Sequence, residues 1–76
     1  MEMEFTQIND GTIESVAFDE IDGQLHIRYS NGKYIIYYEV RKTDYVGLLG
    51  SGGYSTYIEE KIAPGYPSYK VKGERL

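Results

Sequence analysis

Apolar and polar residues alternate along two neighbouring stretches of this chain. In the first stretch Val16 and Phe18 fall on one face, and in the second Leu25 and Ile27 do the same. A period of two residues is typical of β-strands that bury one face. We therefore expect two strands here, and His26, which alternates with Leu25 and Ile27, is expected to point outward as an exposed strand residue.

The segments between these stretches contain glycine at turn positions. Residues 21–23 read Ile-Asp-Gly, and residues 30–32 read Ser-Asn-Gly, in which Asn-Gly adopts the positive φ values of tight hairpins. A third strand is expected from Lys33 to Val40, with large apolar groups on both faces. Such a strand is either covered on both sides or half buried against a partner chain or a ligand. Together these patterns predict an antiparallel β-meander.

The apolar spacing becomes helical after this strand. A first helix is expected to carry Tyr45 and Leu48, with Thr43 or Asp44 as its N-cap and Gly50 as its end. A second helix is expected after a glycine-rich connector, where a Thr and a Glu three residues apart fit a capping box. The residues of that proposed box are Thr56 and Glu59.

Length and composition favour one small domain. A chain of 76 residues without cysteine has a core of marginal size, and association into a homo-oligomer would add stability. We predict an α+β fold in which a small antiparallel β-meander sheet packs against one or two short helices. The expected parts are an N-terminal strand and turn (1–12), the meander (13–40), a helical segment with a glycine-rich loop (41–62) and an extended C-terminal segment (63–76).

Charge and tyrosine are divided unevenly along the chain. The first 24 residues hold seven acids, no base and no tyrosine, whereas all nine tyrosines and all eight Lys and Arg residues follow. Tyrosine beside Lys or Arg suits bases and phosphates, because a flat ring stacks and a cation pairs with an anion. We therefore expect any ligand surface in the second part of the chain.

The order of short motifs resembles the KTSC domain, a short domain found at the C-terminus of some lysyl-tRNA synthetases and also alone in small bacterial and phage proteins. The resemblance covers about residues 13–71 and rests on the following elements, in this order. They are Val16-Ala17-Phe18-Asp19, Leu25-His26-Ile27-Arg28-Tyr29, Gly32, Tyr37, Val40, Tyr45, Leu48-Leu49, a Ser/Gly turn, Ile62 and Tyr66-Pro67-Ser68-Tyr69.

The resemblance implies two functions. One is RNA binding, suggested by the synthetase setting of the domain. The other is that of a phage-type sponge, because compact β-rich phage proteins of this size sequester cyclic nucleotide or cyclic ADP-ribose signals of bacterial immunity. Net charge -4 favours the second, since long nucleic acid needs many phosphate contacts whereas a small nucleotide needs only two or three cations. A structural protein-protein interaction module is a third alternative.

The candidate binding residues come from three places. The glycine-rich loop could expose backbone N–H groups ahead of a helix and hold phosphate, or it could be only a flexible link. Some of the many tyrosines must lie at a surface, and two basic clusters could contact phosphate or simply be solvated. The chosen set is Tyr37, Arg41, Ser51, Gly52, Gly53, Tyr54, Tyr57, Lys70 and Lys72, with Arg75 near the last two.

Rings, backbone N–H donors and cations are expected to converge in the region from Tyr37 and Arg41 to the glycine-rich loop with Tyr54 and Tyr57. Tyr37 and Arg41 close the third strand, and the loop follows one short helix later, so folding is expected to bring them together. The tyrosines Tyr29, Tyr38 and Tyr45 are expected to be structural, from their alternation or helical spacing.

Enzymatic chemistry has little support in this sequence. One histidine and no cysteine exclude a His/Cys metal cluster within one chain and a cysteine nucleophile. The N-terminal acids lack the pattern of an EF-hand loop. No cofactor or catalysis is expected. No apolar run approaches the roughly 20 residues needed to cross a bilayer, and no signal peptide is apparent, so we expect a cytoplasmic protein, in the host cytoplasm if phage-encoded.

Overall fold

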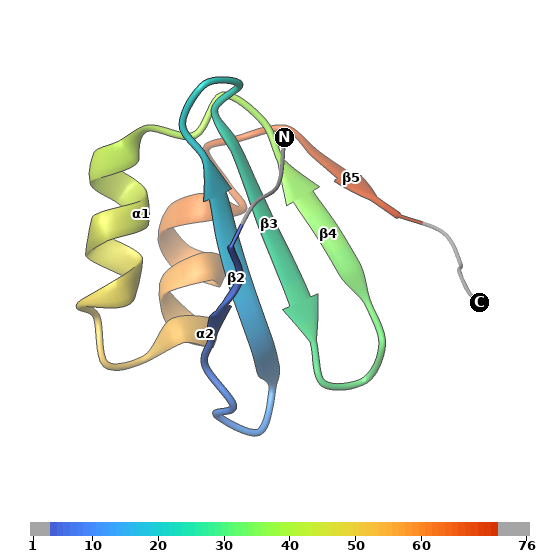
Figure 1. Ribbon diagram of the computed structural model, residues 1–76. Helices are drawn as coiled ribbons and strands as arrows, with labels where there is room; N and C mark the ends of the chain where they lie inside the picture. The colour runs from blue at the N-terminus through green and yellow to red at the C-terminus, as the bar shows by residue number, and fades with distance from the viewer. Residues whose placement is uncertain (1–3, 72–76) are drawn as a thin grey trace.

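The sheet is a five-stranded antiparallel meander in the order β1-β2-β3-β4-β5. The computed structural model describes residues 4–71. The chain runs through the elements in the order β1 (Thr6–Gln7), β2 (Ile13–Asp19), β3 (Gln24–Tyr29), β4 (Tyr34–Tyr37), α1 (Lys42–Leu49), α2 (Tyr54–Tyr57), a π-helical stretch (Ile58–Ile62) and β5 (Ser68–Lys70). Both helices cover one face of the sheet (Figure 1). The expected α+β fold is confirmed.

The turns of the meander form at the glycines that the sequence placed there. Gly23 and Gly32 have φ values of 68° and 98°, in the region that favours glycine. The Asp19 carboxylate accepts backbone N–H bonds at the first turn, and Asn31 accepts one from the Lys33 backbone at 3.0 Å in the second. These local bonds fix the register of both hairpins, because the turn determines which residues pair across the strands.

The inner face of the sheet, which faces the helices, builds the core. Its buried residues are Ile13, Val16, Leu25, Ile27, Tyr37, Val40, Leu48, Ile58 and Ile62. Sheet residues contribute one side of this cluster, and Leu48 of α1 with two isoleucines of the π-helical stretch contribute the other. Burying each such side chain contributes about 1.5 to 3 kcal/mol relative to exposure. The helices are therefore held by their apolar residues.

The third strand is shorter than the sequence suggested. It ends at Tyr37 rather than Val40, because Glu39 adopts a positive φ of 60° and breaks the alternation. The Val40 amide then donates to the Gly23 carbonyl at 2.8 Å. As a result Val40 lies in the same core as Tyr37, whereas strict alternation had placed the two residues on opposite faces.

The helices differ from expectation at their N-termini. Helix α1 begins at Lys42 with Arg41 as its N-cap, so neither Thr43 nor Asp44 caps it, while Gly50 ends it as expected. Helix α2 begins directly after Gly53 and carries no side-chain cap, so the proposed capping box of Thr56 and Glu59 is wrong. Thr56 lies inside α2 and Glu59 inside the π-helical stretch, because α2 starts three residues earlier than that box requires.

The outer face of the sheet, opposite the helices, carries Ala17, His26, Arg28, Tyr34 and Ile36. His26 is only 7% exposed, so its expected exposure is wrong. Its ring Nδ1 bonds the Tyr34 hydroxyl at 2.7 Å, and its Nε2 bonds the side-chain oxygen of Gln24 at 3.1 Å. Phe5 packs edge-on against the same ring. Alternation placed His26 on the correct face, but neighbouring side chains cover it there.

Within residues 4–71 no helix is long and apolar enough to span a membrane. Among the same residues, no group of three or more His, Cys, Asp or Glu side chains is arranged to hold a metal ion.

Candidate functional site

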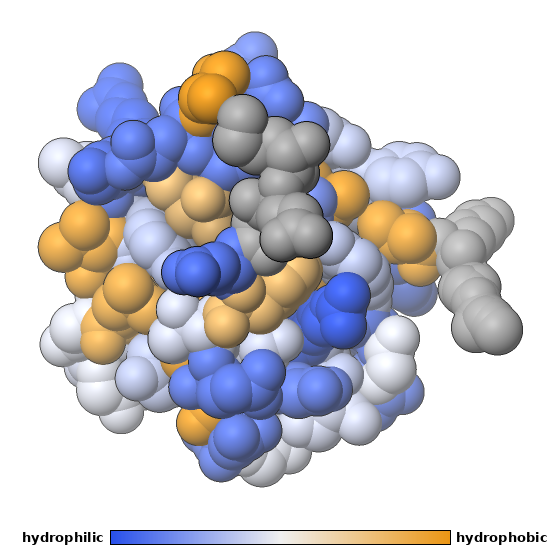
Figure 2. Space-filling model, viewed as in Figure 1, coloured by the Kyte–Doolittle hydropathy of each residue, from blue (hydrophilic) through white to orange (hydrophobic). Residues whose placement is uncertain are grey.

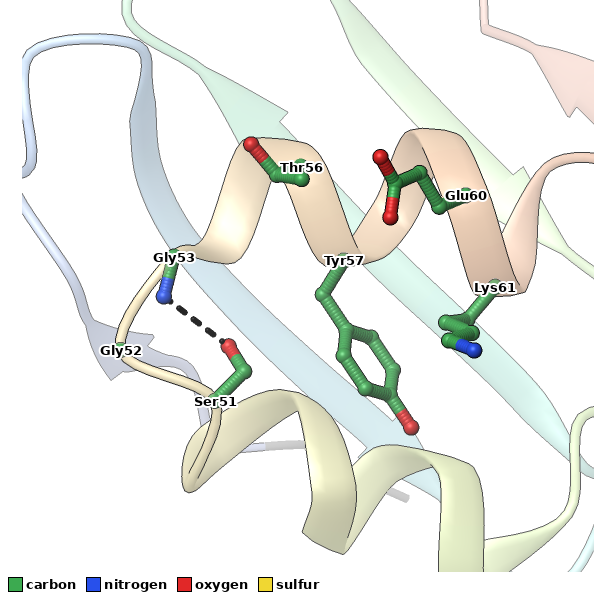
Figure 3. A pocket seen from close by; sticks show the side chains of 7 residues that line it. All are labelled: Ser51, Gly52, Gly53, Thr56, Tyr57, Glu60 and Lys61. Carbon is green, nitrogen blue, oxygen red and sulfur yellow. Dashed lines mark hydrogen bonds between the residues drawn. The ribbon is translucent and has the colours of Figure 1, made fainter.

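A pocket of about 380 Å³ opens beside the loop that joins the two helices (Figure 3). Its lining residues are Ser51, Gly52, Gly53, Thr56, Tyr57, Glu60 and Lys61. We call it the glycine-loop pocket. Four of these residues belong to the set predicted from sequence, namely Ser51, Gly52, Gly53 and Tyr57. The glycine-rich connector is therefore part of a concave surface.

The loop at the mouth of the pocket is held by its own hydrogen bonds. The Ser51 hydroxyl donates to the Leu48 carbonyl at 2.9 Å and accepts from the Gly53 amide at 3.2 Å (Figure 3). Gly52 has a φ of 77°, which a residue with a side chain would adopt only with strain. These bonds give the loop a defined shape.

The first turn of α2 offers backbone donors next to this loop. The first intrahelical bond runs from the Tyr57 amide to the Gly53 carbonyl at 2.9 Å. The amides of residues 54–56 precede it, and no side chain of the described residues caps them. Free N–H groups at a helix start carry partial positive charge and bind anions.

Tyr57 forms one wall of the pocket and packs against α1. A Cβ atom added to Gly47 would collide with the Tyr57 hydroxyl, so only glycine at this position of α1 lets the ring approach so closely. In Figure 3 the Tyr57 side chain points from its own helix toward the other helix. A glycine inside a helix costs about 1 kcal/mol relative to alanine, and this contact gives it a structural role.

Two charged residues of the pocket were missed by the sequence analysis. Glu60 and Lys61 come from the π-helical stretch, which the bond from the Ala63 amide to the Ile58 carbonyl at 2.7 Å identifies. The sequence did contain a signal for their position beside Thr56 and Tyr57. Glu60 follows Thr56 by four residues, and Lys61 follows Tyr57 by four residues. Residues four apart share one face of a helix. The pocket therefore combines one cation with one anion.

Tyr37 and Tyr54, both proposed for stacking, do not line this pocket. Tyr37 is 6% exposed and belongs to the core, where burial raises the pKa of its phenol. Its ring is therefore enclosed by protein and not presented to a ligand. Tyr54 packs partly buried against the core.

The expected convergence of Arg41 with the loop is wrong. Arg41 caps the start of α1, and the loop follows the end of this eight-residue helix. At 1.5 Å per residue the helix separates them by about 12 Å. The Arg41 amide instead donates to the Tyr66 hydroxyl at 3.5 Å, and that hydroxyl donates to the Asp44 carboxylate. The bond to Asp44 raises the pKa of the Tyr66 phenol.

The predicted C-terminal cations do not join the pocket either. Lys70 is exposed on the edge strand β5, which pairs with β4 away from the helices (Figure 1). Lys72 and Arg75 lie outside the described residues. Within residues 4–71, Lys61 is thus the cation that lines the pocket.

Comparisons with known proteins agree on one family. A family model described as the KTSC domain matches residues 9–66. The fold is similar to the crystal structure of a KTSC domain protein from Yersinia pestis, with a TM-score of 0.84 and 15% sequence identity over 93% of this chain and 100% of the other. A search of curated proteins finds no match. At this low identity the structural likeness concerns the fold.

Proposed function

The chain belongs to the KTSC domain family, and we propose that it binds and sequesters a small cyclic nucleotide signal without converting it. The observation that supports this proposal is the glycine-loop pocket, where backbone donors, a tyrosine ring and a lysine line one concave surface. A sponge of this kind is suited to a phage that counters bacterial immune signalling.

The pocket lining suggests how a nucleotide would be oriented. The phosphate would sit against the amides of residues 54–56 with Lys61 as counter-charge, since both favour an anion. The Glu60 carboxylate repels phosphate and accepts hydrogen bonds, so it would face a base amino group or a ribose hydroxyl. Tyr57 offers an aromatic surface beside them for a base.

The size of the pocket fits one nucleotide unit better than a whole cyclic dinucleotide. Pockets for drug-sized ligands span about 300 to 1,000 Å³, and this one is near the lower end at about 380 Å³. The second half of a dinucleotide would project from the pocket toward solvent or a second subunit. A cyclic mononucleotide would be held within one chain.

The side chains at hand support the proposal of binding without turnover. The pocket lining contains no imidazole, and the chain has no thiol. The single histidine, His26, lies on the outer face of the sheet, with both ring nitrogens engaged in hydrogen bonds. The ligand would therefore leave the protein chemically unchanged.

We also propose that the protein associates into a homo-oligomer. Val46 and Leu49 of α1 are 56% and 37% exposed, and Leu49 lies directly before the loop that borders the pocket. A second copy covering α1 would bury these side chains and close the pocket from one side. Sedimentation at micromolar concentration is expected to show a dimer or larger species, and a strict monomer would remove the basis for a shared site.

The function is tested by thermal shift against cyclic mononucleotides, cyclic dinucleotides, cyclic ADP-ribose isomers and an oligoribonucleotide. One cyclic nucleotide should raise the melting temperature, bind in a whole-number ratio to subunits by calorimetry, and be recovered intact. Steeply salt-dependent binding to the oligoribonucleotide alone would instead favour RNA as the partner. Absence of any shift would reject both.

Variants locate the site. Lys61→Gln should weaken binding about tenfold, the effect of losing one charge-assisted hydrogen bond. Gly47→Ala should push the Tyr57 ring from its place against α1 and weaken binding as well. The matched control is Lys42→Gln, which removes an exposed lysine at the far end of α1. Equal affinity in all three would place the ligand elsewhere.

A further inference from the structure

Arg28 is held between two aromatic rings on the outer face of the sheet. Its guanidinium carbon lies 4.6 Å from the centre of the Phe5 ring and 5.3 Å from the centre of the Tyr34 ring. The two rings meet edge to face with their centres 6.4 Å apart. Cation–π contacts of this kind fix the plane of a guanidinium and leave its N–H edge available.

The Tyr34 ring, one of the two that contact Arg28, is itself held in place. The Tyr34 hydroxyl bonds Nδ1 of His26 at 2.7 Å, and the buried His26 ring is fixed on its other side by Gln24. Phe5 packs edge-on against both the His26 and the Tyr34 rings. The position of the guanidinium is therefore set by neighbours that are already in place before any ligand arrives.

No carboxylate of the described residues neutralises this cation. Across residues 4–71 the one ion pair joins Lys42 to Glu20 and does not include Arg28. An arginine that is oriented but unpaired has donors that match the oxygens of a phosphate or carboxylate. A purely structural cation–π contact would account for the stacking, but it makes no use of the N–H edge.

A hollow of about 230 Å³ opens beside Arg28. It is lined by Glu14, Arg28, Tyr29, Gly32, Lys33 and Tyr34, and we call it the Arg28 hollow. Lys33 directly precedes β4 and brings a second cation to the same space. Three of the hollow's lining residues are charged, which suits a polar ligand better than an apolar partner. Figure 2 shows hydrophobic and hydrophilic residues interspersed on the face in view.

Glu14 brings the one negative charge to the hollow. The pairing of β2 with β3 shifts register between Ile13 and Ser15, so Glu14 sits in a β-bulge. A bulge redirects the side chain of the extra residue. Glu14 forms no ion pair with Arg28 or Lys33 within the part of the chain described. Its carboxylate lowers the local positive potential without occupying either cation.

We propose that the Arg28 hollow is a second, phosphate-binding site, in which Arg28 contacts two phosphate oxygens and Lys33 a third. Phosphate matches this pair better than carboxylate does, because it offers more oxygens and more charge to two cations. The volume admits a phosphate with a sugar attached. This site shares no lining residue with the glycine-loop pocket, so it does not depend on the function proposed there.

The test is a titration of the whole protein with inorganic phosphate at constant ionic strength, followed by ¹⁵N NMR. Saturable shifts are expected at the Arg28 side-chain Nε–H and at the amides of residues 28–34. Ribose 5-phosphate and a nucleoside monophosphate form two further arms, which show whether an attached sugar or base adds affinity. No saturable shift at residues 28–34 in any arm would overturn the proposal.

Three variants give the proposal sharper outcomes. Arg28→Gln should weaken phosphate binding about tenfold, and Arg28→Lys should recover only part of it, since lysine keeps the charge and loses the planar fork. Glu14→Gln should tighten binding about threefold by removing the opposing charge. Arg41→Gln, at an exposed arginine outside the hollow, is the control.

These variants also separate a binding role from a structural one. Each is first checked for an unchanged melting temperature, and Arg28→Lys serves if Arg28→Gln fails to fold. If Arg28 only supports the sheet, Glu14→Gln should not increase the affinity for phosphate. That result, or an equal loss of affinity in Arg41→Gln, would refute the site.

Discussion

The two faces of the sheet are built from the same alternating strands and are stabilised in different ways. On the inner face, nine buried apolar residues pack the strands against the helices. On the outer face, buried His26 is satisfied by hydrogen bonds to Tyr34 and Gln24, and two aromatic rings pack against exposed Arg28. Alternation of apolar and polar residues therefore predicts which face of the sheet a residue occupies. It does not predict which polar residues on that face are buried.

The largest difference between the faces should appear on truncating one isoleucine from each. Ile27 is fully buried on the inner face, so Ile27→Ala should cost about 2 to 5 kcal/mol of unfolding free energy. Ile36→Ala on the outer face should cost less, about 1 kcal/mol, because that side chain is only partly buried. Urea denaturation measures both, and equal losses would contradict the distinction.

A second comparison concerns the hydrogen bonds of the outer face. His26→Ala should destabilise the fold by about 1 to 3 kcal/mol, since it leaves the Tyr34 hydroxyl and Gln24 without their partner and opens space under Phe5. A double-mutant cycle with Tyr34→Phe should show coupling. Replacing an exposed strand histidine by alanine would change stability by less than about 0.5 kcal/mol. A loss that small in His26→Ala would show that the hydrogen bonds of His26 do not stabilise the fold.

The two faces should also lose stability at opposite ends of the pH scale. On the inner face, burial raises the pKa of Tyr29 to about 12. The nearby Tyr37 and Glu59 contribute smaller effects in the same direction. The folded state thus disfavours the phenolate, and stability present below pH 10 should fall as pH rises toward 12. After allowance for solvent screening, the loss should be about 1 to 2 kcal/mol.

On the outer face the sign is reversed. Burial lowers the pKa of His26 below 6.5, Arg28 adds to this effect, and Asp19 opposes it. Stability should therefore be intact above pH 6.5 and decline as pH falls below that value, because the unfolded chain binds the proton more tightly. Urea titrations should show both arms of this profile in the wild type, whereas Tyr29→Phe should lose the alkaline arm and His26→Gln the acidic arm. Identical profiles in all three proteins would refute the assignment.

The smallest effect is expected away from both faces. Lys42 and Glu20 form an ion pair at 2.6 Å, but their side chains are 65% and 59% exposed. Exposed pairs of this kind contribute about 0.2 to 1 kcal/mol and are screened by salt. Lys42→Gln should therefore change the melting temperature by only a degree or two at low salt and by nothing measurable at high salt. A larger loss of melting temperature would mean that this ion pair at the start of α1 contributes more to stability than an exposed pair should.

The sequence predicted the meander well because its signals are local. Alternation in β2 and β3, with glycine at the turns, depends on residues close in the chain. It missed the bend at Glu39, since the bend is fixed by bonds from its neighbours to distant partners, namely Val40 to Gly23 and Tyr38 to Pro67. The burial of His26 was missed for the same reason. Phe5, which packs edge-on against the His26 ring, is distant from it in the sequence.

The candidate site was predictable only where its residues are consecutive. The loop glycines and Tyr57 were found from turn composition and tyrosine position. Arg41 was misplaced because closeness in sequence was taken for closeness in space, although a whole helix intervenes. Lys61 was missed because cations were sought as clusters, whereas this lone lysine reaches the pocket by helical spacing from Tyr57.

We propose that the helix side of the molecule, and not its outer face, receives the nucleotide. Amide shift mapping by ¹⁵N NMR, with whichever cyclic nucleotide raises the melting temperature, tests it most directly. We predict that the largest shifts at low ligand concentration fall on residues 51–57 and 60–61, disappear in Lys61→Gln and persist in Arg28→Gln. Shifts centred on residues 28–34, lost in Arg28→Gln and retained in Lys61→Gln, would contradict it.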